Sequence, residues 1–130
     1  MDATTHENVL AALHGEAFAY ARYKLFARAA RKGGDDRLGA MFDGIAAVEL
    51  EEHFAELAEL VGLAGTDVDN IRAALQDEDA EVEAMYPEFA KQARAAGEHA
   101  VADRFEEIAG DESEHSKTLE QALERLVVPA

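Results

Sequence analysis

The sequence predicts an all-α protein, an antiparallel four-helix bundle made of two helical hairpins. Only 2 of its 130 residues are proline and 48% are hydrophobic, a composition that favours a helical globular chain over disorder. No stretch alternates apolar and polar residues with a period of two over the length of a strand. Breakers at 32–36, 62–69 and 95–99 leave four segments, each long enough for several helical turns.

The four helices are expected to pair in chain order within a single domain, 1–130. The first two form a hairpin over 6–61, the last two form a hairpin over 69–127, and 62–68 is the linker. The expected helix ranges are about 6–32, 36–61, 69–96 and 98–127.

Each helix has an apolar seam with the spacing of one helix face, and each seam carries glutamate near its middle. In the first helix, for example, Val9 and Leu13 lead to Glu16. Asp67 or Asp69 can cap the third helix. Pro87 removes one backbone hydrogen bond inside that helix and should kink it or force a bulge.

An internal repeat of 63 residues relates the two hairpins. When the chain is displaced by that length against itself, aromatic residues and glutamates coincide, namely Tyr23 with Tyr86, Phe42 with Phe105 and Glu49 with Glu112. The agreement predicts two pseudo-symmetric hairpins that bring carboxylates to one level.

Charge and composition exclude several classes of function. The net charge of −16 repels nucleic acid and anionic membranes. The absence of cysteine excludes disulfides, thiolate metal sites and a thiol nucleophile within these residues. No run approaches the roughly 18 apolar residues of a membrane span, and the N-terminus lacks the pattern of a signal peptide. We therefore expect a cytoplasmic protein without a nucleic-acid or membrane partner.

The buried carboxylates indicate a metal site. Six glutamates on the seams have few internal cations to pair with, and they would repel one another or take up protons unless a cation joined them. Two divalent ions would solve this, and oxygen-rich ligation with one or two imidazoles suits iron or manganese better than structural zinc. The glutamates are Glu16, Glu49, Glu52, Glu78, Glu81 and Glu112, and His115 lies three residues after Glu112, as a chelating pair requires.

Four stretches together resemble the di-iron domain of rubrerythrins, within the ferritin-like superfamily. They are "GEAFAYARY" (15–23), "VELEEH" (48–53), "EDAEVEAMYPEFAKQA" (78–93) and "DESEH" (111–115). The resemblance implies a ferritin-like bundle with two iron ions, for which manganese or zinc are alternatives. It also implies that electrons come from an external donor, such as a rubredoxin-type protein or a reductase, because the cysteine-ligated rubredoxin domain of full-length members has no counterpart here.

The resemblance also implies roles for individual residues. Glu16, Glu49, Glu78 and Glu112 would be carboxylate ligands, Glu49 and Glu112 would bridge the ions, and His115 would be the nitrogen ligand of one iron. Glu81 would match the extra glutamate that lets one iron shift on oxidation. Tyr23 and Tyr86 would match tyrosines that hydrogen-bond to ligand carboxylates, although both could simply pack in the core.

The sequence leaves one ligand open. By the internal repeat, Glu52 occupies the place of His115, yet a histidine follows it at once. On a regular helix Glu52 lies about −60° and His53 about +40° from Glu49, so His53 needs a small rotation or a local bulge. We prefer Glu52 as the ligand and keep His53 as the alternative.

The linker and a second apolar stripe predict a homodimer. Ferritin-like bundles run their second and third helices parallel, and the short linker is near the limit of such a crossover. A domain-swapped dimer resolves this, and an up-down-up-down monomer is the alternative. Leu50, Phe54, Leu57 and Val61 could form a dimer face.

The resemblance therefore implies an oxidoreductase that reduces hydrogen peroxide at a di-iron site, protecting against oxidative stress. Two other functions stay open. One is ferrous oxidation by oxygen with iron storage or buffering, and the other is a structural helical dimer with incidental metals.

Overall fold

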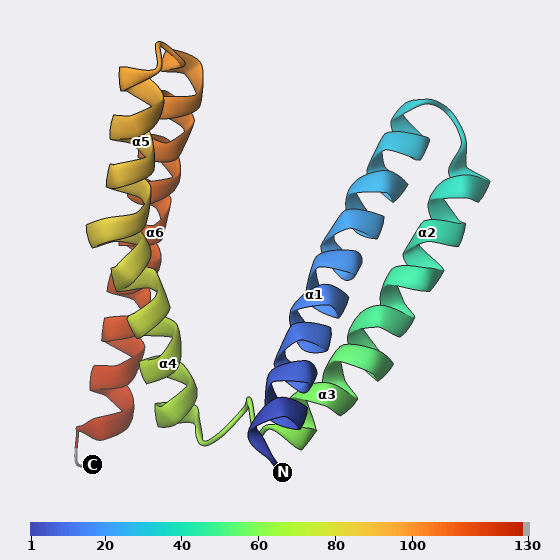
Figure 1. The fold of residues 1–130 in the computed structure, drawn as a ribbon, viewed down its shortest axis with the longest axis horizontal. Helices are drawn as coiled ribbons and strands as arrows, with labels where there is room; N and C mark the ends of the chain where they lie inside the picture. Colours follow the sequence, from blue (N-terminus) through green and yellow to red (C-terminus); the bar gives the residue numbers. More distant parts are fainter. Residues whose placement is uncertain (129–130) are drawn as a thin grey trace. The chain divides into compact units, whose positions relative to one another are not determined.

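The structure, a computed structural model, describes residues 1–128, which form two compact units. The first unit ends at Ala64 and the second begins at Gly65. Each unit is a hairpin of two long helical rods (Figure 1). The all-α class is confirmed, because residues 1–128 contain helices and no strand. The grouping of both hairpins into one domain stays a prediction.

The first hairpin begins with the longest helix of the unit, whose N-terminal amides are capped by a carboxylate. Asp2 accepts a hydrogen bond from the Thr5 amide at 2.8 Å, and Asp35 caps the second rod through the Leu38 amide at 2.9 Å. Such caps satisfy amides that have no partner within the helix. The elements are α1 (Ala3–Lys32), α2 (Asp36–Val48), the π-helical turn η1 (Glu49–Phe54) and α3 (Ala55–Leu60).

The second hairpin begins at a capping box. Thr66 accepts a hydrogen bond from the Asp69 amide, and the Asp69 carboxylate accepts one from the Thr66 amide. The helix cap is thus Thr66, and Asp69 completes the box, whereas the sequence had suggested Asp67 or Asp69 as the cap. The elements are α4 (Asp67–Ala80), the π-helical turn η2 (Glu81–Met85), α5 (Tyr86–Ala95) and α6 (His99–Val127).

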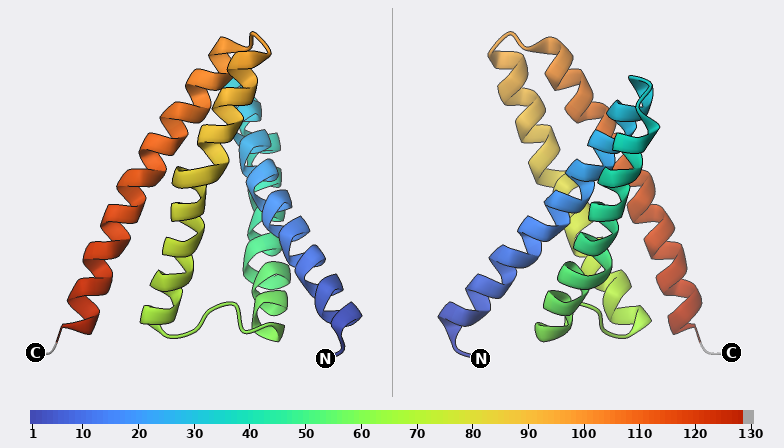
Figure 2. Two further views of the ribbon diagram at one scale, coloured as in Figure 1. Left: turned by 60° about the vertical axis from the view of Figure 1, so that its left-hand side comes forward. Right: turned by 90° about the vertical axis from the view of Figure 1, so that its right-hand side faces the viewer.

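A π-helical bulge, η2, directly precedes Tyr86 and Pro87, which is one of the two outcomes that the sequence predicted. A proline ring in a helix clashes with the carbonyl four residues earlier, here that of Glu83. Glu83 lies inside η2, where the wider turn relieves that clash. The rod continues through η2 into α5 (Figure 2).

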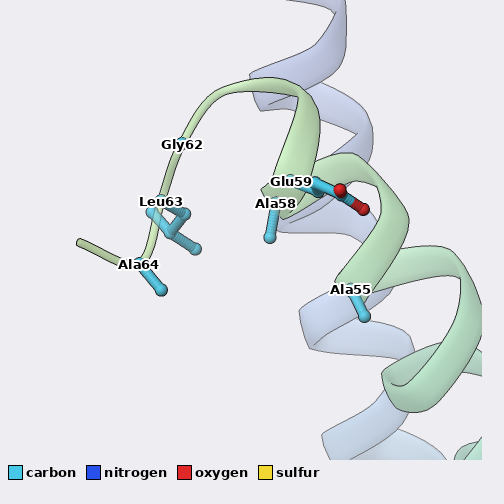
Figure 3. Close-up of a pocket in the computed structure, with 6 residues that line it drawn as sticks. All are labelled: Ala55, Ala58, Glu59, Gly62, Leu63 and Ala64. Carbon is cyan, nitrogen blue, oxygen red and sulfur yellow. The ribbon is translucent and has the colours of Figure 1, made fainter. Parts of the chain in front are cut away.

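Gly62 ends the first hairpin. It adopts φ +62°, a left-handed conformation that glycine takes without a steric penalty. The Leu63 amide then donates to the Ala58 carbonyl at 3.0 Å, and the Gly62 amide donates to Glu59 at 3.2 Å, which is a Schellman motif. The reversal leaves a shallow hollow of about 400 Å³ beside Ala55 and Ala58 (Figure 3).

Small side chains form the contact between the two rods of each hairpin. The most buried residues are mainly alanines, which let helices approach closely, and they are Leu13, Ala27 and Ala46 in the first hairpin and Ala90, Ala93 and Ala102 in the second. Three aromatic rings pack together in each contact, in the half nearer to the loop that joins the two rods. The Phe26–Phe42 centroids lie 5.5 Å apart, and their repeat counterparts Phe89 and Phe105 lie 5.6 Å apart. The internal repeat is therefore present in the packing.

Larger apolar side chains stay partly uncovered on both hairpins. Phe26 is 39% exposed, Phe89 41% and Ile45 39%. A hairpin of this size buries little apolar surface, and these seams are the part of it left uncovered. None of the helices in residues 1–128 has the length and apolar content needed to cross a membrane.

Candidate metal centre

The first hairpin brings two carboxylates and an imidazole together. Glu16 projects from α1, while Glu49 and His53 project from η1. Nδ1 of His53 lies 3.4 Å from Oε2 of Glu16 and 3.5 Å from Oε1 of Glu49. One potential ligand atom from each residue lies within 4.8 Å of the other two, a spacing that a single ion could span.

The second hairpin contains a matching cluster. Glu78 projects from α4, while Glu112 and His115 project from α6. Nδ1 of His115 lies 3.1 Å from Oε2 of Glu112 and 3.7 Å from Oε1 of Glu78. The three potential ligand atoms again lie within 4.8 Å of one another.

The two π-helical turns make the clusters equivalent. Tyr23 matches Tyr86, and Glu49 matches Glu112, at an offset of 63, but Glu16 matches Glu78 at an offset of 62. The extra residue falls between Glu78 and Tyr86, where η2 lies.

The offset changes back from 63 to 62 within the first hairpin. After Glu49 the offset returns to 62, so that His53 matches His115 and not Ser116. The extra residue here belongs to η1. Each hairpin therefore carries one inserted residue next to its ligands. In the first hairpin it lies in the second rod, and in the second hairpin it lies in the first rod.

The π-helical turn also explains why His53 faces the cluster. Hydrogen bonds in such a turn span five residues, so each residue rotates less about the axis than in an α-helix. Four residues after Glu49 then complete nearly one full turn. In α6, which is α-helical throughout, His115 needs only three residues after Glu112.

Glu52 and Glu81, two other predicted ligands, lie outside these clusters. Glu52 is exposed on η1, whereas His53 lies in the cluster. Glu81 is half-buried one turn after Glu78, at the start of η2. Its charge adds to the effect of Glu112 and of burial in raising the pKa of Glu78. Glu81 thus acts electrostatically on the cluster without belonging to it.

The two predicted tyrosines pack in the aromatic clusters. Tyr23 stacks on Phe42 at 6.1 Å, and Tyr86 lies 6.0 Å from Phe105. Within residues 1–128, neither hydroxyl hydrogen-bonds to a glutamate. Burial raises the pKa of Tyr86, and the charges of Glu81, Glu112 and Glu78 raise it further. The pKa of Tyr86 therefore depends on the charge of the second carboxylate cluster.

The carboxylates of each cluster shift one another's pKa in opposite directions. The hydrogen bond between Glu16 and Glu49 lowers the pKa of Glu16 and raises that of Glu49. In the second hairpin the hydrogen bond with Glu112, assisted by burial, raises the pKa of Glu78 to about 7. The same hydrogen bond and that of His115 lower the pKa of Glu112. Carboxylates this close cannot all ionise unless a cation joins them.

Two buried oxygens lack partners. Oε2 of Glu16 and Oε2 of Glu78, which are repeat counterparts, are inaccessible to solvent and form no hydrogen bond with residues 1–128. A buried carboxylate oxygen without a partner is costly. An ion in each cluster would satisfy it, so the residues fit a pair of metal ions. The donors are carboxylate oxygens and one imidazole per cluster, a set that suits iron or manganese.

One buried hydrogen bond fixes the height of the second cluster. Oγ of Ser116 donates to Oδ1 of Asp79 at 3.0 Å, and Ser116 is only 7% exposed. These residues directly follow His115 and Glu78. The bond therefore holds α4 and α6 in the register that places the ligands together. The sequence reasoning missed this pair, which carries no motif.

Comparison with known proteins gives one matching family. The family model described as Rubrerythrin matches residues 35–123. A rubrerythrin of Porphyromonas gingivalis is 33% identical over 125 residues, which cover 87% of this chain and 62% of that protein. A symerythrin of Cyanophora paradoxa is 32% identical, with 81% of this chain and 74% of that protein covered.

A nigerythrin of Nitratidesulfovibrio vulgaris is 30% identical, with 88% of this chain and 63% of that protein covered. The chain thus spans less than two thirds of the length of the rubrerythrin and the nigerythrin. Among solved structures, dithionite-reduced symerythrin from Cyanophora paradoxa is 28% identical. That match covers 95% of this chain and 85% of the other, with a TM-score of 0.47.

Proposed function

We propose, from the finding that the chain belongs to the rubrerythrin family, that it reduces hydrogen peroxide at a di-iron site with electrons from a separate protein. The observation that carries this proposal is the pair of matched clusters, each with a buried carboxylate oxygen that lacks a partner. Manganese or zinc are the alternative metals.

The proposed ligands are those that the geometry favours. Glu16, Glu49 and His53 would hold one ion, and Glu78, Glu112 and His115 would hold the other. Glu49 and Glu112 would bridge the two ions, as the resemblance to rubrerythrins implies. His53 replaces Glu52 in this assignment, since the imidazole and not the exposed carboxylate lies beside Glu16.

Reduction of peroxide to two waters consumes two electrons and two protons. Two ferrous ions, when bound, supply the two electrons for cleavage of the O–O bond. The protein must hold protons near them. Tyr86 keeps its hydroxyl proton at neutral pH, because burial and three nearby glutamates raise its pKa. It is our candidate for a donor of hydrogen bonds to a ligand carboxylate or to peroxide, and Tyr23 is its counterpart.

A complete site needs two hairpins, since each cluster offers only three ligands. We propose that the half-covered seams of two hairpins pack together and bring the clusters into one centre. This arrangement would bury the exposed apolar side chains and supply each ion with carboxylates from both hairpins.

The linker supports a domain-swapped dimer. Glu49 lies 11 residues before the end of α3, and Glu78 lies 11 residues after the start of α4. If α3 and α4 run parallel with these residues at one level, the chain must span roughly 33 Å. Six residues separate the two helices, and they reach about 25 Å when extended. Hairpins from two chains avoid this crossover.

Anaerobic stopped-flow spectroscopy tests the proposed reaction. The metal-loaded, chemically reduced protein is mixed with peroxide and, separately, with oxygen. We expect two electrons of oxidation per bundle with peroxide, and a much slower reaction with oxygen. Rapid reaction with oxygen alone would contradict peroxide reduction and would indicate ferrous oxidation with iron storage.

A further inference from the structure

A cationic surface on the first hairpin stands out in a strongly acidic chain. Residues 22–37 contain six of the twelve lysines and arginines and only two acidic residues. This stretch carries a net charge of +4, so the rest of the chain carries −20. An acidic protein would be repelled by the rest of the chain and attracted to this cationic surface.

The centre of this surface is a hollow of about 300 Å³ between the two rods, lined by Lys24, Arg28, Arg31 and Asp43. Lys24 and Arg31 both bind Asp43, at 2.8 Å and 2.5 Å. Arg28 forms no ion pair within residues 1–128. Three cations thus face one carboxylate, and the hollow retains two positive charges.

The internal repeat supplies a matched comparison within the molecule. The equivalent hollow in the second hairpin is lined in part by Pro87, Lys91, Arg94 and Glu106, at the offset of 63. There Arg94 binds two carboxylates, Asp103 at 3.0 Å and Glu106 at 2.8 Å. That hollow is electrically balanced, so the excess of cations is not a requirement of the hairpin fold.

Exposed apolar side chains lie on α1, the helix that also carries the three cations of the hollow. Phe18 is 66% exposed and Leu25 58%, and the repeat counterpart of Leu25 is the exposed Glu88. Leu25 lies nine residues after Glu16, which places it on the opposite side of α1. A hairpin that covers the metal ligands would therefore leave this surface free. Apolar residues with a charged rim are typical of a protein-docking surface.

The surface is also connected to the interior. The guanidinium of Arg22 lies 5.6 Å from the ring centroids of both Phe18 and Tyr23. Tyr23 in turn stacks on Phe42 between the rods. A short series of side chains thus leads from the exposed face into the hairpin that holds Glu16 and Glu49.

From this geometry we infer that Phe18, Leu25 and the cationic hollow dock a small acidic electron-carrier protein. The inference rests on the proposed function, which needs an external donor, and it identifies where that donor binds. A one-electron carrier would dock twice, lose one electron each time, and return both metal ions to the reduced state.

A second copy of this chain fits the surface less well. Contact between two such surfaces would place one hollow with two excess positive charges against another. Contact with the acidic surface of another copy is head-to-tail, and such contacts build open chains unless the rotation closes. Charge complementarity therefore favours a different, acidic protein.

The test measures binding with a defined probe. A fluorophore-labelled acidic rubredoxin with zinc in place of iron is titrated with the metal-loaded protein, and fluorescence anisotropy gives the affinity. The double variant Leu25→Glu, Arg28→Glu reverses the surface, and Lys91→Glu makes the same kind of change at the repeat counterpart of Arg28. All three positions are exposed, and circular dichroism checks that the variants fold.

We expect the double variant to weaken binding by about tenfold or more at low salt, and Lys91→Glu to change it less than about twofold. Binding to the wild type should weaken as salt is added. Absence of binding, or equal losses in both variants, would overturn the inference. It would also be overturned if the double variant bound the probe normally but changed its sedimentation, because the occupant would then be a second copy.

Peroxide turnover with a small neutral reductant separates this inference from the proposed function. The double variant should match the wild type in that assay, since its substitutions lie away from the ligands. If the wild type does not turn over peroxide, the proposed function fails, while the anisotropy still decides whether an acidic carrier binds.

Discussion

Nδ1 of His53 lies 3.5 Å from Oε1 of Glu49, although the two residues are four apart on one helix. In the other hairpin the equivalent pair, His115 and Glu112, is three apart at 3.1 Å. The inserted residue of η1 accounts for the difference.

Deletion of Glu51 should be tolerated. It removes the inserted residue, converts η1 to α-helix and leaves a Glu-x-x-His spacing like that of Glu112 and His115. We expect metal content and the melting temperature to stay close to those of the wild type. The matched control deletes Ser113, which moves His115 to two residues after Glu112 and should abolish metal binding in that cluster. Equal losses in both deletions, measured by elemental analysis, would refute the role given to η1.

Glu112→Ala should remove both metal ions, because Glu112 is assigned as a bridge. Glu114→Ala, on the same helix, removes a carboxylate that pairs only with Lys117 at 3.0 Å. This control should keep two ions per bundle. Elemental analysis of the as-isolated proteins checks both. A Glu112→Ala protein that kept two ions would contradict the assignment.

Metal-free protein should become less stable as the pH rises from about 4.5 to about 7. The pKa of Glu78 rises from 4.5 to about 7 on folding, so in this window the folded protein holds a proton that the unfolded chain has lost. Stability therefore falls with rising pH. A bound metal ion replaces that proton, so the loaded protein should lose metal as the pH falls.

Melting temperatures at pH 5.5 and pH 7.5, with and without metal, measure this effect. Glu78→Gln is the control, since it cannot titrate and should show a weaker dependence when metal-free. An unchanged pH dependence in Glu78→Gln would mean that another group is responsible.

A longer linker should convert a dimer to a monomer. Insertion of about 15 flexible residues after Leu63 lets one chain cross the roughly 33 Å between α3 and α4. Light scattering should give twice the chain mass of 14.1 kDa for the wild type and one chain mass for the insertion variant. A monomeric wild type would rule out the domain swap and support an up-down-up-down bundle.

The fold was largely predictable because it depends on patterns that the chain repeats. Apolar periodicity and breakers indicated two helical hairpins, and the matching glutamates indicated their common level. The family resemblance is confirmed by the comparisons, and with it the ferritin-like class.

The choice between Glu52 and His53 was not predictable from a regular helix. A fixed rotation of about 100° per residue places Glu52 among the metal ligands. The π-helical turn η1 places His53 there instead. The sequence did contain the signal, namely the change of offset from 62 to 63 at Glu78–Tyr86 and back to 62 at His53. An ungapped comparison of the two hairpins conceals it. The hydrogen bond that Ser116 donates to Asp79 belongs to no motif, so it could only come from coordinates.

The most direct test of the central claim is an anomalous-scattering map at the iron edge from crystals of the loaded protein. We predict two iron peaks per bundle, one bonded to a ring nitrogen of His53 and the other to a ring nitrogen of His115. A single peak, or a first ion bound by Glu52 with His53 turned away, would contradict the account.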